Sequence, residues 1–277
     1  MSIPIRPSLS VLMSVYWRDS PEFLALALQS LHSQSWLADE IVLVKDGPLS
    51  DALEAVIAEY ASQLPLVCLS LPENQGLGVA LKLGLEKCRF DLVARMDADD
   101  ISVPHRFERQ MNFMQAHPQV DILGSSIAEF NSDPDQCETE RRLPVEHEQL
   151  YAFAKWRSPM NHMTVMYRKS AVLSAGSYAS ITGLEDYDLW VRMLLSGARF
   201  HNLDEVLVFA RKGNGMQARR GGLGYARREL ALLASFRRLG FLTFGQMCVR
   251  GVVRILPRLM PTTWRTVLYE RFLRIRQ

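Results

Sequence analysis

Residues 90–100 read FDLVARMDADD, an apolar run that is followed at once by Asp97, Asp99 and Asp100. The run is short and is bounded by polar residues, which favours a buried strand over residues 90–96. Side chains two apart on a strand share a face, and at its end they can converge on one point. We therefore predict a strand whose carboxyl end presents a group of carboxylates.

This strand is the fourth in a regular alternation with helices. Apolar runs at residues 8–16, 40–44 and 66–71 predict three earlier strands, and helical patterns at 23–34, 50–63 and from a loop at 74–78 to about 87 separate them. Such alternation over short connections is typical of a mainly parallel sheet covered by helices. Ligands of these sheets bind beyond the carboxyl ends of the strands, so the pattern also predicts the location of a site.

Polar or aromatic residues follow all four predicted strands. Tyr16 could stack on a nucleobase or only cover the rim of the sheet, and Asp46 could accept a hydrogen bond from a base or stabilise the turn before Gly47. Asp97 and Asp99 offer the hard oxygen ligands that Mg²⁺ or Mn²⁺ prefers. A diphosphate could bind through such a metal ion. The alternative for this pair is a solvated acidic loop with a helix cap.

The second half of the chain is less regular. Its patterns predict a helix from Arg106 to about residue 117, a strand over 120–130, a polar loop over 131–142 and a helix over 146–154. A strand over 163–167, a short helix over 169–175, an amphipathic helix over 185–195 and a strand over 205–210 follow. A basic, glycine-rich stretch that includes Arg219 could bind a diphosphate or be a solvated loop.

The helix over residues 185–195 begins with three acidic side chains, Glu185, Asp186 and Asp188. All three could simply favour the positive end of the helix. One of them could instead act as a general base on an acceptor hydroxyl, and their spacing does not choose among them.

Composition excludes several classes of protein. The 277 residues are 48% hydrophobic and 22% charged, which is ordinary for a globular chain and rules out disorder or fibrous repeats as the main state. The four cysteines form no CxxC pair, and the first twenty residues lack the apolar stretch of a signal peptide. These features predict a protein of the reducing cytosol, without a zinc site or disulfides.

Charge is concentrated at the C-terminal end. From Arg227 onward there are eleven arginines and two glutamates, a net charge of +9, which leaves −7 for the rest because the whole chain carries +2. Predicted helices at 236–256 and 264–275 place apolar residues beside a basic rim, as in helices that lie on anionic membranes. A helical subdomain packed on the core with solvated arginines is the alternative.

Seven stretches together resemble a family-2 glycosyltransferase of the GT-A fold: VLMSVY, EIVLVKDGP, ENQGLGVAL, ARMDADDISVPHRF, NHMTVMYRK, GLEDYDLWVRML and GNGMQARRGG. Within the family, the chain is similar to enterobacterial transferases of amylovoran, exopolysaccharide and O-antigen biosynthesis. The resemblance implies an α/β, Rossmann-like nucleotide-diphospho-sugar transferase with a mixed, mainly parallel sheet. It divides the chain into a catalytic domain over 1–225, with halves at 1–105 and 106–225, and a basic amphipathic helical tail over 226–277.

The resemblance also implies roles for individual residues. Tyr16 and Asp46 match the nucleobase-binding positions. Asp97 and Asp99 match the DxD pair, with Asp99 as the ligand of Mg²⁺ or Mn²⁺, and Arg106 matches the arginine after that loop. Lys82 stands where many members have an asparagine, and it is expected, with Arg219, to supply charge to the donor. Asp186 matches the catalytic base.

The implied activity is an inverting, metal-dependent transfer of a hexosyl-type sugar from a nucleotide-diphosphate sugar to a saccharide hydroxyl. The acceptor is expected to be lipid-linked, and the enzyme to be peripheral on the inner face of the cytoplasmic membrane, with no nucleic-acid partner. A nucleotidyltransferase of sugar phosphates and a non-catalytic scaffold for glycan assembly are the two alternatives. The sugar, the base and the linkage are not specified by the sequence.

Overall fold

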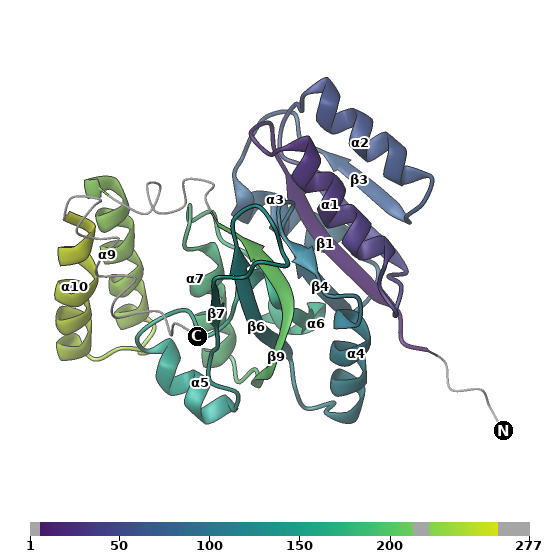
Figure 1. Cartoon of the computed structure of the whole chain (residues 1–277). Coiled ribbons are helices and arrows are strands. Elements are labelled where there is room, and N and C mark those ends of the chain that lie inside the picture. The colour runs from purple at the N-terminus through teal and green to yellow at the C-terminus, as the bar shows by residue number, and fades with distance from the viewer. Residues whose placement is uncertain (1–5, 213–221, 260–277) are drawn as a thin grey trace.

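The computed structural model of the chain describes residues 6–212 and 222–259, with the side chains of 255–259 excepted. A nine-stranded sheet forms its centre, in the order β3-β2-β1-β4-β8-β6-β9-β5, with β7 paired to β6 (Figure 1). The four strands of the first half are all parallel to one another. They are β1 (Leu9–Val15), β2 (Glu40–Lys45), β3 (Leu66–Ser70) and β4 (Leu92–Met96). The predicted parallel, strand–helix half of the fold is confirmed.

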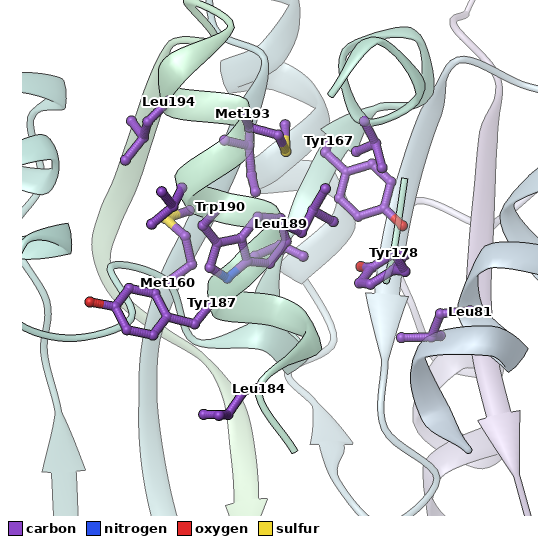
Figure 2. Packing of buried hydrophobic residues seen from close by; sticks show 14 of the residues in the cluster. Leu81, Met160, Tyr167, Tyr178, Leu184, Tyr187, Leu189, Trp190, Met193 and Leu194 are labelled. Carbon is purple, nitrogen blue, oxygen red and sulfur yellow. The ribbon is translucent and has the colours of Figure 1, made fainter. Parts of the chain in front are cut away.

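Helices cover both faces of this sheet. Along β1, Val11 and Met13 join one hydrophobic cluster while Leu12 joins the other, as the two-residue period of a strand requires. The first cluster packs under α1 (Pro21–His32), α2 (Asp51–Ala61) and α4 (Arg106–Ala116). The second packs under α3 (Leu77–Lys87) and α7 (Glu185–Leu195). Figure 2 shows how Tyr187, Trp190 and Met193 of α7 fill that second cluster.

The helices of the first half begin at local signals. The hydroxyl of Ser20 accepts a hydrogen bond from the Phe23 amide at 3.4 Å, and Pro21 occupies the first helical position of α1. Ser50 caps α2 in the same way, with 3.3 Å between its hydroxyl and the Leu53 amide. These caps fix where the chain turns back along the sheet.

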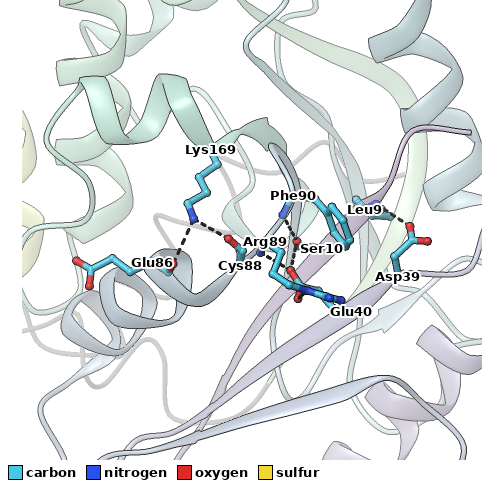
Figure 3. Close-up of polar contacts among 9 residues, drawn as sticks. All are labelled: Leu9, Ser10, Asp39, Glu40, Glu86, Cys88, Arg89, Phe90 and Lys169. Carbon is cyan, nitrogen blue, oxygen red and sulfur yellow. Dashed lines mark hydrogen bonds and ion pairs between the residues drawn. The ribbon is translucent and has the colours of Figure 1, made fainter. Parts of the chain in front are cut away.

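At the amino ends of the strands, the buried carboxylate of Glu40 makes several polar contacts (Figure 3). Glu40 at the start of β2 accepts hydrogen bonds from the Ser10 hydroxyl at 2.6 Å and from the Arg89 guanidinium at 2.7 Å. Nearby, Lys169 donates to the Cys88 carbonyl at the end of α3, at 2.6 Å. The hydrogen bonds of Glu40 thus join the amino end of β2 to β1 and to the loop between α3 and β4.

The second half contains the strands that the sequence pattern predicted and two short ones that it did not. β6 (Ile122–Phe130) lies parallel to β9 (Phe200–Arg211), which begins five residues before the predicted strand, and antiparallel to β8 (Met166–Arg168). Residues 139–141, expected in a loop, form β7 (Thr139–Arg141), and β5 (Ile101–Ser102) pairs with β9. The strand predicted over 163–167 is displaced: residues 163 and 164 belong to a 3-10 turn, η1 (His162–Thr164), and β8 begins at Met166. The two short strands exist because a neighbouring strand supplies their hydrogen bonds, so their own residues carry no clear period.

The short helices of this half lie where the sequence placed them. They are α5 (His147–Ala154) and α6 (Lys169–Ser174). No helix in the described parts of the chain has both the length and the apolar character needed to cross a membrane.

The predicted continuous helix over 236–256 is wrong. The chain instead forms a helical hairpin of α9 (Gly222–Arg238) and α10 (Phe244–Leu259), broken where Gly240 adopts a φ of 77°. A reciprocal cap starts α10: the Thr243 hydroxyl accepts from the Gln246 amide at 3.2 Å, and the Gln246 side chain accepts from the Thr243 amide at 3.0 Å. The helix predicted at 264–275 lies outside the described residues.

The hairpin is not a detached tail. Leu232, Leu233 and Phe236 of α9 are buried in the same hydrophobic cluster as α7, and the Phe236 and Tyr187 rings meet edge to face. Figure 1 shows the hairpin standing beside α7 and α5, at the far side of the molecule from α2. The alternative of a helical subdomain packed on the catalytic core therefore describes α9 correctly.

Candidate active site

Parallel pairing brings the ends of three strands to one edge of the sheet. Val15 of β1 is in register with Lys45 of β2, and Met13 of β1 with Met96 of β4. The residues that follow these strands therefore emerge next to one another. This places the loops that begin at Tyr16, Asp46 and Asp97 on the same rim.

Three carboxylates gather at the end of β4. One oxygen from each of Asp97, Asp99 and Asp100 lies within 4.8 Å of the others. Asp100 is only 3% exposed, and its pKa is raised well above the ordinary value, first by burial and then by the charges of Asp97 and Asp99. The cluster is thus a site of concentrated, incompletely compensated negative charge.

Two arginines from the sheet, one in β4 and one in β9, contact the acidic loop. Arg95, buried within β4, forms an ion pair with Asp97, which raises the pKa of the guanidinium although burial alone would lower it. The backbone amide of Arg211 donates to the Asp100 carboxylate at 2.9 Å, and its guanidinium donates to the Asp99 carbonyl at 3.2 Å. That guanidinium lies against the Phe23 ring at 3.8 Å. The acidic loop is consequently held from two strands.

Arg106 supports this loop from within the core. Its side chain has no exposure and donates to the Arg95 carbonyl at 2.7 Å and to the Ser102 hydroxyl at 2.9 Å. Burial, together with the nearby charge of Arg95, lowers its pKa to about 9. In this structure Arg106 positions the acidic loop and does not face outward as a donor-binding side chain would.

The donor atoms of the cluster suit a divalent cation. Three carboxylates within reach of one point are oxygen ligands of the kind that Mg²⁺ and Mn²⁺ prefer. A cation there would also relieve the repulsion that raises the pKa of Asp100. Arg95 already neutralises part of the charge of Asp97.

Asp46 is committed to the neighbouring loop. Its carboxylate accepts hydrogen bonds from the backbone amides of Gln75 and Gly76, at 2.7 and 3.0 Å, and from the Asn74 side chain at 3.0 Å. Only 3% of the residue is exposed. The structure thus assigns Asp46 to fixing the 74–76 loop, and a direct contact with a nucleobase stays a prediction.

The remaining predicted donor-binding residues are less constrained. Tyr16 is half-buried, and its amide donates to Asp19 at 3.0 Å, so the turn after β1 is fixed while the ring keeps an accessible side. Lys82 is exposed on α3, one and a half turns from its start. Arg219 lies outside the described residues.

The structure distinguishes the three acids at the start of α7. Asp188 is buried and is bound by two nitrogens of Arg192 at 2.8 Å, and Arg192 also donates to the Ser177 carbonyl. Glu185 is buried with one carboxylate oxygen lacking a hydrogen-bond partner, and burial, with the charge of Asp186, raises its pKa. Asp186 is half-buried and makes one long contact, 3.4 Å from the Ser158 hydroxyl. Of the three, Asp186 is the one available to a ligand.

Two observations place the start of α7 near the 74–78 loop and the DxD loop. Gly78 in the first turn of α3 lies so close to the segment before α7 that an added Cβ would be 2.3 Å from the Ala179 carbonyl oxygen and 3.4 Å from the Glu185 Cβ. Tyr178 interacts with both groups of charges: burial raises its pKa, the Tyr167 hydrogen bond and the charge of Arg95 lower it, and the charge of Asp186 raises it. The hydroxyl of Tyr178 also meets the His162 ring nitrogen at 3.1 Å. The DxD loop, the 74–78 loop and the start of α7 are thus neighbours in the fold.

Sequence reasoning gave Asp100 no role beside the Asp97–Asp99 pair, and it missed both Arg95 and Arg211 as supports of the loop. A signal for Arg95 existed, because an arginine inside an otherwise apolar strand needs a buried partner. The contact of Arg211 with Phe23 joins positions far apart in the chain, and no local pattern predicts it.

Comparisons with known proteins agree with this geometry. A family description, glycosyl transferase family 2, matches residues 10–180. The chain is 43% identical over 262 residues to the amylovoran biosynthesis glycosyltransferase AmsE of Erwinia amylovora, covering 95% of this chain and 98% of that one. It is 35% identical over 268 residues to an Escherichia coli UDP-Gal:alpha-D-GlcNAc-diphosphoundecaprenol beta-1,3-galactosyltransferase, covering 97% of each.

The fold is also similar to solved structures. The mannosyltransferase PcManGT of Pyrobaculum calidifontis, solved in complex with GDP-Man and Mn²⁺, superposes with a TM-score of 0.65 over 96% of this chain and 80% of that one, at 15% identity. The expected GT-A architecture is therefore confirmed.

Proposed function

This chain belongs to glycosyl transferase family 2, and from that premise we propose that it transfers a sugar from a nucleotide-diphosphate sugar to a hydroxyl of a saccharide, with inversion at the anomeric carbon. The observation that carries the proposal is that two acidic groups lie on neighbouring elements, linked through Tyr178, which interacts with Arg95 on one side and Asp186 on the other. Asp97, Asp99 and Asp100 suit a metal-bound diphosphate, and Asp186 stands on a neighbouring helix with few contacts of its own.

The donor half of the reaction rests on the carboxylates of the DxD loop. Asp99, with Asp97 and Asp100, would hold Mg²⁺ or Mn²⁺, which when bound supplies positive charge to the departing diphosphate. PcManGT, of the same fold, was solved with Mn²⁺. Arg95 and Arg211 contact the loop directly, and Arg106 contacts Arg95 and Ser102 on either side of it, so the three would keep the loop in place during the reaction.

Lys82, Arg219 and Tyr16 are proposed to contact the donor itself. The exposed ammonium of Lys82 on α3 would add charge near the diphosphate, as would Arg219. The accessible ring of Tyr16 would stack on the base. Asp46 would act on the base only through the loop that it fixes.

Asp186 is proposed as the general base. As the acceptor oxygen attacks the anomeric carbon, its proton passes to Asp186, the new carbon–oxygen bond forms, and the bond to the phosphate oxygen breaks with its electron pair on the nucleoside diphosphate. One displacement of this kind inverts the anomeric centre and needs no covalent enzyme intermediate. The hydroxyl of Ser158, 3.4 Å away, is placed to orient the carboxylate.

The acceptor is proposed to be a lipid-linked saccharide in the assembly of a surface polysaccharide. The supporting observation is similarity along the whole chain to one transferase named for amylovoran biosynthesis and to one named for a diphosphoundecaprenol acceptor. Such an acceptor would place the enzyme peripherally on the inner face of the cytoplasmic membrane. Within the catalytic domain proposed at 1–225, residues 1–105 would bind the donor and 106–225 the acceptor, with 226–277 as a helical extension.

The proposal is tested by donor binding and turnover together. A panel of nucleotide-diphosphate sugars with Mn²⁺ is expected to contain one that raises the melting temperature, because a ligand that binds only the folded state stabilises it. That donor should turn over when radiolabelled, which a non-catalytic scaffold would not do. Binding of a sugar phosphate with nucleotidyl transfer, or no turnover of any stabilising donor, would contradict the proposal.

A further inference from the structure

The surface of the helical hairpin is unusually apolar. The described residues expose fourteen large hydrophobic side chains, and seven of them lie within residues 222–254. They are Leu223, Leu230, Leu239, Phe244, Val249, Val252 and Val253. A cluster of this kind on a short segment is a mark of an interaction surface, whereas isolated exposed apolar residues are ordinary.

The outer face of α10 carries the strongest part of this cluster. Val249, Val252 and Val253 are each more than half exposed, and their spacing of three and four residues puts them on one side of the helix. Arg250 and Arg254 lie on the opposite side, toward the protein. The helix thus exposes apolar side chains on its outer side, while its inner side carries two arginines as well as Met247, which packs on the core.

Both inward arginines lie over aromatic rings, and Arg254 also pairs with a carboxylate, whereas two buried nitrogens of Arg250 have no hydrogen-bond partner. The Arg250 guanidinium is 2% exposed and lies over the Trp156 ring at 4.8 Å. Arg254 pairs with buried Glu229 of α9 at 2.8 Å and lies over the Tyr187 ring at 5.3 Å. These contacts fix the orientation of α10, so the exposure of its valines is built into the packing of the hairpin.

The exposed charges in the described part of the hairpin have one sign. Arg227, Arg228, Arg237 and Arg238 are exposed on α9. Glu229, the one acidic residue in the described part of the hairpin, is buried against Arg254. The exposed hairpin therefore combines apolar side chains with cationic ones and presents no carboxylate.

We propose that the outer surface of the α9–α10 hairpin docks on an anionic lipid bilayer, with Val249, Val252 and Val253 inserted among the acyl chains and the α9 arginines against the headgroups. Apolar insertion and cationic contact are the two components of interfacial helix binding. This inference rests on the peripheral membrane attachment proposed above and identifies the part of the chain that makes the contact. It does not depend on which sugar is transferred.

A second copy of the chain fits the surface less well. Pairing across a two-fold axis brings the same patch of each copy together, so the four exposed arginines of one hairpin would meet those of the other. Like charges at an interface disfavour such pairing, whereas anionic headgroups complement it.

Docking by this surface has a consequence for the acceptor. Arg250 contacts Trp156, two residues before the Ser158 that meets Asp186, and Arg254 contacts Tyr187, the residue after Asp186. The hairpin and the proposed base are therefore parts of one packed unit. A bilayer held by the hairpin would keep the acceptor side of the site near the membrane surface.

The test is sedimentation of the full-length protein with vesicles. Vesicles rich in phosphatidylglycerol are expected to pellet the protein at low salt, with weaker binding to phosphatidylcholine vesicles and at 1 M salt, where the Debye length is only about 3 Å. The double variant Val249→Glu/Val252→Glu should bind about 30-fold or more weakly, because two inserted side chains become anions facing an anionic surface. The matched control, Leu26→Glu/Leu37→Glu, alters two exposed apolar residues of the first half and should bind as the wild type does.

A second variant tests the cationic component. Arg227→Gln/Arg238→Gln should weaken binding about 25-fold, since each arginine near an anionic surface contributes about fivefold. Melting temperatures of all variants should match that of the wild type, which shows that the hairpin still folds. The variant Asp99→Asn should lose sugar transfer yet pellet normally, which separates failure of the catalytic proposal from failure of this one.

Three results would overturn the inference. The first is no binding of the wild type to anionic vesicles at low salt. The second is unchanged binding of the Val249→Glu/Val252→Glu variant, which would leave another part of the chain as the contact. The third is a wild-type dimer in sedimentation equilibrium that the same variant converts to monomer, which would assign the surface to a second copy.

Discussion

The contacts of Asp186 and Asp188 predict opposite consequences for the same chemical change. Replacing either by Asn removes one negative charge from the start of α7 and keeps the shape of the side chain. Asp186 has one long contact, to Ser158, whereas Asp188 is buried and is held by two nitrogens of Arg192. We therefore expect Asp186→Asn to affect the reaction and Asp188→Asn to affect stability.

The magnitudes follow from these contacts. General base catalysis contributes a factor of about 10² to 10⁴, so Asp186→Asn should lower kcat by that much, while its free energy of unfolding stays within about 0.5 kcal/mol of the wild type. Asp188→Asn leaves the Arg192 guanidinium without its anion, 20% exposed and with the Ser177 carbonyl as a remaining acceptor. Breaking such a pair costs about 2–3 kcal/mol, less than a fully buried pair because Asn still accepts one hydrogen bond.

Two assays measure these effects separately. Urea unfolding gives the free energy of unfolding, and initial rates with saturating donor give kcat well below the melting temperature of each variant. Donor binding should stay within a few fold in Asp186→Asn, because the base acts on the acceptor. A dead but stable Asp188→Asn together with an active Asp186→Asn would refute the assignment of the base.

Three further predictions concern Asp99 of the DxD loop, the buried carboxylate of Glu40, and the contact of Gly78 between α3 and the segment before α7. Asp99→Asn should remove nearly all transfer and abolish stabilisation by Mn²⁺ with donor, with an unchanged melting temperature in EDTA; full activity in excess EDTA would contradict a metal requirement. Burial raises the pKa of Glu40, but hydrogen bonds from Ser10 and Arg89 outweigh it and lower that pKa overall, so its contribution to stability is complete above the unfolded-state pKa and is lost as pH falls through the folded one. Glu40→Gln should accordingly cost about 1–3 kcal/mol in urea unfolding at pH 7 and progressively less toward pH 3, and an equal cost at both values would count against the ionic network. Gly78→Ala should cost about 1–3 kcal/mol and weaken donor binding, because its Cβ would meet the Ala179 carbonyl oxygen, while the control Gly224→Ala, with nothing within 4 Å, should stabilise the protein by up to about 1 kcal/mol, since Ala is the better helix former, and should leave donor binding unchanged.

The first half of the fold was predictable because each of its elements carries its own signal. Strand β1 alternates between two hydrophobic clusters, Leu12 on one side and Val11 and Met13 on the other, and its run of apolar residues is bounded by polar ones. Ser20 and Pro21 mark the start of α1 in the sequence itself. The predicted ends of these strands were consequently within two residues of the observed ones.

The second half was less predictable because its elements depend on partners. β5 has two residues and β7 has three, and each exists only through pairing with β9 or β6. The break between α9 and α10 did carry a local signal, since Thr243 and Gln246 have the spacing of a reciprocal helix cap. The continuous apolar pattern around it was read as one helix.

Position along the chain predicted which acids gather and not what supports them. The structure brings the predicted Asp97 and Asp99 together at the end of β4, and their roles stay predictions. The resemblance assigned Arg106 to the donor, and its place after a strand suggested a base contact for Asp46, whereas the structure buries Arg106 behind the acidic loop and engages Asp46 with the 74–76 loop. A charged side chain at the rim of a sheet has two possible directions, and only the tertiary contacts decide between them.

The same ambiguity, on a larger scale, applies to α10. Its valines and arginines repeat at helical spacing, and such a pattern alone predicts apolar residues toward the protein and charges toward solvent. The contacts beneath the helix reverse this for its two arginines: Arg250 lies over the Trp156 ring, and Arg254 lies over the Tyr187 ring and pairs with the Glu229 carboxylate. Val249, Val252 and Val253 consequently remain on the exposed side of the helix. The predicted basic rim is therefore wrong for Arg250 and Arg254, and the proposed membrane contact needs the valines of α10 and the exposed arginines of α9 instead.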